Sequence, residues 1–108
     1  MPRPKKPRCV TARPAVTAYV PAGMSPAGEL SLSVDEFEAL RLSDMEGFDQ
    51  AAAAERMEVS RQTYGRILAA ARRTLATAVV TGQAIQIGGG VYTMGGGRRR
   101  RRRRRGGA

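Results

Sequence analysis

The stretch QAAAAERMEVSRQTYGRIL, residues 50–68, decides which fold we expect. Its alanine-rich start favours a helix, because alanine is the best helix former and Asp49 can cap the helix that follows it. Ser60 can cap a second helix, predicted over about 61–81. Two helices joined by the short break Glu58-Val59 predict a helix-turn-helix.

The second helix carries an apolar stripe that we expect to face the core. Its members recur at three- and four-residue steps: Tyr64, Ile67, Leu68, Ala71, Leu75, Ala78 and Val79. Ala54 offers a small side chain where two such helices approach each other. Glu58 departs from the usual pattern, because the backbone there favours positive φ, which costs a non-glycine residue ~1 kcal/mol. The alternative interpretation is an ordinary helical hairpin with an apolar seam.

The start of the second helix carries polar side chains that lie off this stripe, where a helix-turn-helix meets base edges. We expect Arg61, Gln62 and Arg66 to contact bases, because arginine pairs with guanine edges and glutamine with adenine. Ser60 and Thr63 are candidates for phosphate contacts at the helix N-terminus. Arg72 and Arg73 complete the candidate DNA-binding set, as contacts to backbone phosphate. The alternative is that both side chains are simply solvated.

An earlier helix is predicted over about 34–45. Ser33 followed three residues later by Glu36 is a capping box, and Gly47 is expected to end the helix. Acids in its first turns also raise the alternative of acid–base catalysis. Capping and the helix dipole explain their placement, so we predict no catalytic residue and no enzyme.

The flanking segments predict a small β element. Ala84 to Ile87 alternates apolar and polar residues, and Val91-Tyr92 could extend this strand and pair with the region of Val16. The expected fold is therefore mostly α, a three-helix helix-turn-helix with helices at about 34–45, 50–57 and 61–81. The expected organisation is a basic, proline-rich arm and loop over 1–29, the helix-turn-helix domain over 30–94, and a disordered glycine- and arginine-rich tail over 95–108.

The net charge of +10 is concentrated in the two ends of the chain. Residues 1–29 carry five basic groups and one acid, residues 30–97 carry six and eight, and residues 98–108 carry eight arginines. Basic arms on a nearly neutral domain favour a polyanionic partner, bound without reading of sequence. The expected non-specific phosphate contacts are Arg3, Lys5, Lys6 and Arg8 in the arm, and Arg98, Arg99, Arg100, Arg101, Arg102, Arg103, Arg104 and Arg105 in the tail.

The chain has one cysteine and no histidine, which excludes several kinds of site. A single-chain zinc site, a Ser-His-Asp triad and an intrachain disulfide all lack the residues they need. We therefore expect no metal and no cofactor. No apolar run approaches the ~20 residues of a membrane span, and no apolar segment follows the basic start, so we expect a cytoplasmic protein. A domain this small is marginal alone, which leaves a homodimer open.

Several segments together carry a family resemblance. They are MPRPKKPR at 1–8, PAG at 21–23, LSVDEFEALRLSDMEGFDQ at 32–50, VSRQTYGRIL at 59–68 and GQAIQIGGGVY at 82–92. In them the chain resembles a prokaryotic family of small predicted DNA-binding proteins, domain of unknown function 134. The helical core is also similar to region 4 of bacterial sigma factors. The resemblance implies a helix-turn-helix DNA-binding protein.

The function we expect is sequence-specific binding of double-stranded DNA, in the service of transcriptional regulation. Two alternatives stay open. The basic arms could bind RNA, although few aromatic side chains are available to stack on bases. The face formed by Arg61 to Arg66 could instead contact another protein.

Overall fold

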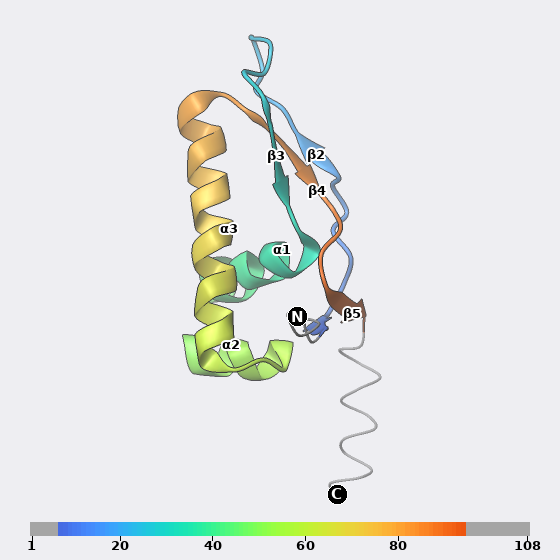
Figure 1. Ribbon diagram of the computed structural model, residues 1–108, viewed down its shortest axis with the longest axis vertical. Helices are drawn as coiled ribbons and strands as arrows, with labels where there is room; N and C mark the ends of the chain where they lie inside the picture. Colours follow the sequence, from blue (N-terminus) through green and yellow to red (C-terminus); the bar gives the residue numbers. More distant parts are fainter. Residues whose placement is uncertain (1–6, 95–108) are drawn as a thin grey trace, which may run out of the picture.

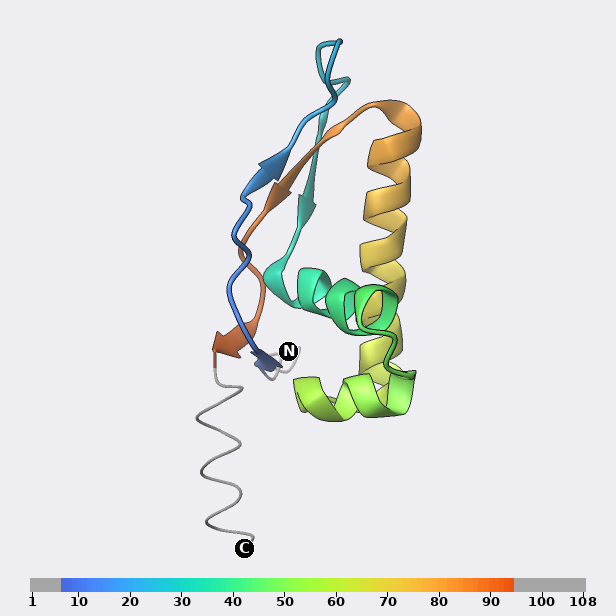
Figure 2. The same cartoon turned by 180° about the vertical axis from the view of Figure 1, so that it is seen from behind.

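The computed structural model describes residues 7–94. A long helix stands on one side and a three-stranded sheet on the other, with two shorter helices packed near one end of the long helix (Figure 1). The view from behind shows the same arrangement (Figure 2). The elements thus form a helical layer against a small sheet layer.

The helices begin and end close to where the sequence places them. Helix α1 spans Val34–Leu40 and continues as a π-helical turn, η1, over Arg41–Met45. Helix α2 spans Gln50–Met57 and helix α3 spans Arg61–Thr81. The capping box of Ser33 and Glu36 is present at the start of α1. Gly47 and Gly82 follow α1–η1 and α3 with φ of 82° and 75°, a conformation that glycine adopts without a steric penalty.

Five short strands form two separate sheets. Strand β3 (Glu29–Leu32) pairs in parallel with β4 (Ala84–Ile87), and β2 (Ala18–Tyr19) pairs antiparallel with the other edge of β4. Strands β1 (Arg8–Val10) and β5 (Tyr92–Met94) form a parallel pair. Parallel neighbours need a crossover connection. All three helices lie in the crossover between β3 and β4, which is why α3 packs along this sheet.

The prediction of a mostly α, three-helix fold is wrong. Helix makes up 47% of the described chain and strand 18%, in two sheets, so the fold is an α/β mix. The expected strand Ala84–Ile87 is present and pairs next to Val16, through β2 and a hydrogen bond from the Ile87 N–H to the Thr17 carbonyl at 2.9 Å. The expected extension by Val91-Tyr92 is wrong, because Tyr92 lies opposite Arg8 in a separate sheet. Most of these pairings join segments distant in sequence, and single-segment patterns do not record distant partners.

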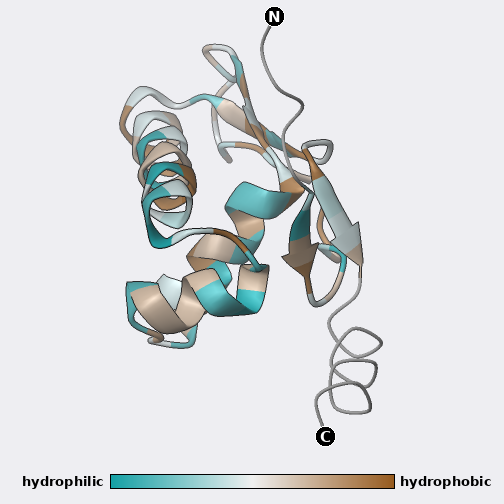
Figure 3. Cartoon of the chain, turned by 60° about the horizontal axis from the view of Figure 1, so that its bottom comes forward, coloured by the Kyte–Doolittle hydropathy of each residue, from teal (hydrophilic) through white to brown (hydrophobic). Residues whose placement is uncertain are grey.

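The core has two parts, and hydrophobic residues occur on every helix (Figure 3). The first part joins the three helices through side chains that include Leu42, Met57 and Tyr64. The second part packs α3 against β3 and β4 through Leu32, Ala71, Ala78, Ile85 and Ile87. The predicted apolar stripe of α3 is therefore right for five members and wrong for two: Leu75 is 41% exposed and Val79 is 75% exposed.

Among residues 7–94, no helix combines the length and the apolar character that a membrane crossing requires.

Candidate nucleic-acid interface

The turn between α2 and α3 is fixed by backbone and capping hydrogen bonds. Asp49 caps α2 by accepting from the Ala52 N–H at 2.8 Å, and Ser60 caps α3 by accepting from the Thr63 N–H at 3.0 Å. Glu58 adopts the left-handed conformation, with φ of 58°, that the sequence led us to expect. The Val59 N–H donates to the Ala54 carbonyl at 3.1 Å. Together these contacts set the direction in which α3 leaves the turn.

Tyr64 anchors the first half of α3 to α1. Its side chain is completely buried, and its hydroxyl donates to the Ala39 carbonyl at 3.0 Å and shares a hydrogen bond with the Ser43 hydroxyl. Burial raises the pKa of Tyr64, while the hydrogen bond with Ser43 acts in the opposite direction. This anchor holds one face of α3 inward, so the opposite face is presented to solvent.

The outward face of the first half of α3 carries the predicted base-reading residues. Arg61, Gln62 and Arg66 are all exposed, and Arg73 continues the row at helical spacing. Within residues 7–94, none of these four side chains makes a hydrogen bond or ion pair with another described residue. Helix α3 contains four arginines and no acid. Its outer face is therefore basic and available for an anionic ligand.

The other predicted arginine contacts lie elsewhere and are engaged. Arg8 does not belong to an exposed arm: it is 8% exposed in β1, with its Nε 3.9 Å from the Asp35 carboxylate. That placement argues against a phosphate contact, because a buried guanidinium facing a carboxylate already has its counter-charge. Arg72 donates two hydrogen bonds to Asp44, at 3.1 and 2.7 Å. This pair raises the pKa of Arg72 and lowers that of Asp44.

The remaining predicted contacts lie at the N-terminus of α3. The Ser60 hydroxyl donates to the Thr63 hydroxyl at 3.0 Å while it accepts from the Thr63 N–H. Arg61 occupies the first turn, where the helix dipole disfavours a positive charge, and no acid offsets it there. The helix dipole and Arg61 thus add to each other at this end, which favours an anion.

Two further residues, Gln50 and Gly65, lie beside the predicted contacts on this surface. Gln50 is exposed at the start of α2, and its side-chain oxygen lies 3.5 Å from where a Cβ on Gly65 would stand. That distance is ordinary van der Waals contact, so packing does not require glycine at position 65. A signal for Gly65 existed in the sequence, because glycine inside a long helix destabilises it by ~0.5–1 kcal/mol relative to alanine.

Arg66 also borders a polar cavity of about 420 Å³ between α3, the start of α1 and the segment before β5. Asp35 and Glu36 line this cavity together with Thr63 and Arg66. Arg8 lines it as well, so two guanidiniums stand against two carboxylates and the lining has no net positive charge to attract a phosphate. An anionic ligand is therefore expected on the outer side of α3 rather than in this cavity.

Some predicted contacts fall outside the described residues, namely Arg3, Lys5, Lys6 and Arg98 to Arg105. Within residues 7–94, no group of three histidine, cysteine, aspartate or glutamate side chains is placed to hold a metal ion.

Comparison with known proteins gives the family. The sequence pattern of a family described as "Protein of unknown function DUF134" matches residues 1–95. The chain belongs to this family. Among the relatives of this DUF134 chain, a UPF0251 protein of Syntrophobacter fumaroxidans is 55% identical over 92 residues, which are 83% of this chain and 59% of that protein. A UPF0251 protein of Thermoanaerobacter pseudethanolicus is 49% identical, over 85% of this chain and 80% of its own length.

A third relative, from Chlorobaculum tepidum, is 50% identical over 84% of this DUF134 chain and 61% of its own length. The chain thus spans about three fifths of two of these relatives. No solved structure matches the DUF134 chain.

Proposed function

We propose that this protein binds duplex DNA through the outer face of the first half of α3, and that it serves in transcriptional regulation. Helices α2 and α3 act in this proposal as a helix-turn-helix motif carried by an α/β domain. The same proposal includes a helical core similar to region 4 of bacterial sigma factors. The protein is then a cytoplasmic binding protein rather than an enzyme.

The observation that carries the proposal is the contrast between two sets of arginines. Arg8, Arg41 and Arg72 each face a carboxylate within 4.0 Å. Arg61 and Arg66 have none of the described carboxylates within 4.0 Å, although both stand on a helix. Exposed, unneutralised guanidinium groups on a fixed helical face suit a polyanion that lies along that face.

The chemistry of the row suits base edges as well as phosphates. An arginine donates two hydrogen bonds to guanine in the major groove, and a glutamine pairs in the same way with adenine. Gln62 and Arg66 are four residues apart, so they lie about one turn apart on the same face. The N-terminus of α3, with Ser60 and Thr63, is suited to a phosphate beside the groove.

Gly65 lies on this face and gives independent support. A Cβ there would meet only the Gln50 side-chain oxygen, at an ordinary contact distance of 3.5 Å, yet glycine weakens the helix. Close approach of the backbone to a ligand explains a glycine at such a place. Gly65→Ala should therefore raise the free energy of unfolding by ~0.5–1 kcal/mol and lower DNA affinity. Thermal unfolding and DNA titration of the same variant measure the two effects.

The main experiment is selection of bound sequences from randomised DNA duplexes by the full chain. Arg66→Ala should relax the preference at one base position, by ~1–3 kcal/mol of discrimination. Arg66→Lys keeps the charge but loses the two-pronged donor geometry. It should therefore retain non-specific affinity and lose the base preference.

Arg13→Ala is the control, because Arg13 is an exposed arginine between β1 and β2, on neither α2 nor α3. It removes one charge without changing the proposed reading face, so its base preference should equal that of the parent chain. If Arg61→Ala and Arg66→Ala both leave specific affinity unchanged, the α3 face is not the reader. Tighter binding to single-stranded RNA than to duplex DNA would favour the RNA alternative.

The arginine tail is proposed to add affinity without specificity. Each phosphate neutralised on duplex DNA changes the slope of log affinity against log salt by ~0.9. Deleting Arg98 to Ala108 should therefore make the slope shallower and weaken specific and scrambled duplexes alike. Titrations at several salt concentrations measure this effect, and an unchanged slope would mean that the tail does not engage DNA.

A further inference from the structure

The second half of α3 and the neighbouring strand β2 expose a continuous group of apolar side chains, here called the apolar end. Its members and their exposed fractions are Tyr19 at 58%, Val20 at 67%, Leu75 at 41%, Val79 at 75% and Val80 at 82%. Single exposed apolar residues are normal on a protein surface, whereas a contiguous group of large ones marks an interaction site.

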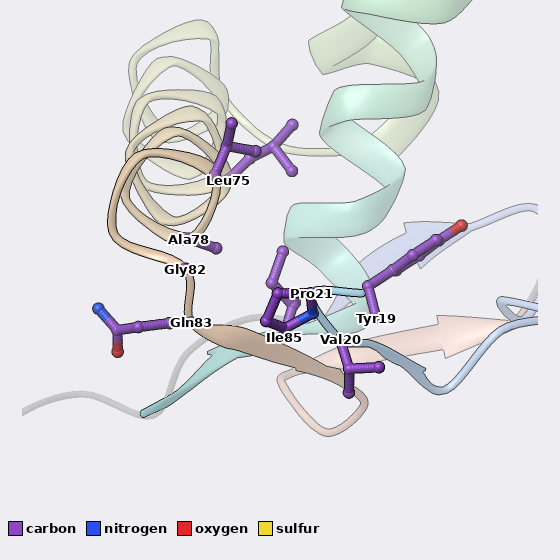
Figure 4. A pocket seen from close by; sticks show the side chains of 9 residues that line it. Tyr19, Val20, Pro21, Leu75, Ala78, Gly82, Gln83 and Ile85 are labelled. Carbon is purple, nitrogen blue, oxygen red and sulfur yellow. The ribbon is translucent and has the colours of Figure 1, made fainter. Parts of the chain in front are cut away.

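The apolar end contains a hollow as well as projecting side chains. A cavity of about 350 Å³ opens between α3 and the sheet, with Leu75 on one side and Tyr19, Pro21 and Ile85 on the other (Figure 4). None of the residues that line it is charged. The cavity therefore offers nothing to a phosphate or another ion, and it suits an apolar side chain.

We infer that the occupant is the apolar end of a second copy of this chain, so that the protein is a two-fold symmetric dimer. In a two-fold contact the same patch of both copies forms the interface. A projecting side chain on one copy must therefore fit a hollow in the same patch of the other copy. The apolar end meets this requirement, because the exposed Val79 stands at the edge of the cavity. Each copy can insert its Val79 side chain into the cavity of the other.

Charge fixes the direction of the two helices. A parallel contact would bring the arginines of the two α3 helices together. An antiparallel contact keeps the Arg61–Arg66 ends apart by far more than the ~8–10 Å over which charges interact in physiological salt. The apolar ends then meet without repulsion between the basic ends, so we expect the two α3 helices to be antiparallel.

This dimer sets the distance between its two reading faces, a consequence that rests on the proposed function. At ~1.5 Å per residue, the middle of the Leu75–Val79 segment is roughly 20 Å along α3 from the middle of the Gln62–Arg66 segment. Two antiparallel copies would place their reading residues about 40 Å apart along the helix direction, and inclination of the helices shortens this component. The repeat of successive major grooves is ~34–36 Å.

The two reading faces would also share a component of direction toward one side of the dimer. Around the helix, Gln62 and Arg66 lie on average roughly two fifths of a turn from Leu75 and Val79. Consider the direction in which each reading face points. Rotation about a two-fold axis perpendicular to both helices does not change the part of that direction that lies along the axis. Both faces can therefore meet the same side of one duplex, at half-sites about one helical turn apart.

The first test is the mass of the full chain in solution without DNA, by sedimentation equilibrium. The parent chain should be a dimer, and Val79→Asp should raise its dissociation constant at least about tenfold. The matched control is Ala70→Asp, an exposed α3 residue outside the apolar end, and it should leave the dimer intact. Circular dichroism checks that both variants keep their helices, and Val79→Ala serves as a milder variant if the aspartate prevents folding.

A parent chain that is monomeric at every concentration reached would overturn the inference. So would a dimer that Val79→Asp and Ala70→Asp affect equally. The second test is the spacing of half-sites in selected DNA: the parent should prefer two half-sites one turn apart, and Val79→Asp should bind single half-sites without that preference. A dimer that binds no DNA would refute the proposed function and keep this inference, whereas a monomer that reads a half-site would do the reverse.

Discussion

The two halves of α3 share one helical geometry and have opposite surroundings. In the first half, Tyr64, Ile67 and Leu68 are buried under α1 and α2, and the outer face is basic. In the second half the same periodic stripe continues, but Leu75 and Val79 are exposed and only Ala78 is buried. The difference teaches that periodicity identifies the face that could be buried, while burial itself depends on which elements are there to cover it.

The prediction with the largest expected effect compares the loss of one large side chain from each half of α3. Tyr64→Ala should lower the free energy of unfolding by ~3–5 kcal/mol, because it leaves a cavity and removes the hydrogen bond to Ala39. Leu75→Ala should cost ~1 kcal/mol or less in the isolated domain, since much of that side chain is already exposed. Urea unfolding of both variants measures the ratio, and equal losses would contradict the division of α3 into two halves.

A second test adds volume where the first half of α3 meets α2. Ala54 is 3% exposed and belongs to the core that joins the three helices. Ala54→Leu should therefore destabilise the domain by ~1–3 kcal/mol through overpacking. Ala51→Leu is the control, because Ala51 is exposed on the same helix, and its midpoint of thermal unfolding should barely change. A neutral Ala54→Leu would mean that α2 and α3 are loosely packed.

A third test concerns the turn that directs the first half of α3. Glu58 is the one non-glycine residue with positive φ among residues 7–94. Glu58→Gly should stabilise the domain by up to ~1 kcal/mol, because glycine has no Cβ to strain that conformation. Glu55→Gly, inside α2, should have the opposite sign, ~0.5–1 kcal/mol less stable. Thermal melts of the two variants should therefore move in opposite directions.

The smallest expected effect is at the boundary between the halves, where Arg72 pairs with Asp44. The hydrogen bond from Arg72 holds the pKa of Asp44 below its ordinary value of 3.8. The pair therefore contributes stability above that value, and the contribution is lost as the pH falls through the lower folded pKa. Because both side chains are about half exposed, Asp44→Asn should cost no more than ~1 kcal/mol at neutral pH.

The comparison for Asp44→Asn is Arg73→Ala, which removes a neighbouring guanidinium that forms no ion pair with the described residues. Its thermal midpoint should stay unchanged at any pH, whereas the difference between Asp44→Asn and the parent should vanish in acid. A difference that persists below the folded pKa of Asp44 would show that the pair does not act through charge.

Local signals in the sequence predicted much of this fold. The caps Ser33, Asp49 and Ser60 mark helix starts correctly, because each makes its hydrogen bond within three residues. The strand Ala84–Ile87 was predicted, but the extent of the β structure was not. Strands β1 and β5 contain three residues each and gain their order from a distant partner. The strand Glu29–Leu32 did carry a signal, since Leu30 and Leu32 alternate with exposed residues.

The candidate site shows the same limit. Arg61, Gln62 and Arg66 could be assigned to an exposed face from helical spacing alone. Nothing in the spacing distinguishes Arg8, which is buried beside Asp35, from an arginine in a solvated arm. Gln50 lies close to Gly65 of α3 because the turn at Glu58 and Val59 sets the angle between α2 and α3. Local rules predict where a side chain points on its own helix, and tertiary pairing decides whether that direction is solvent.

The pairing of β1 with β5 has a consequence for the order of folding. Residues Arg8 and Tyr92 are register partners, so almost the whole described chain forms one closed loop between them. Contacts between residues so distant in sequence slow folding, because the loop entropy is lost before the contact is gained. The helices α1, α2 and α3 follow one another in the sequence and close shorter loops, so we expect them to pack before β1 and β5 pair.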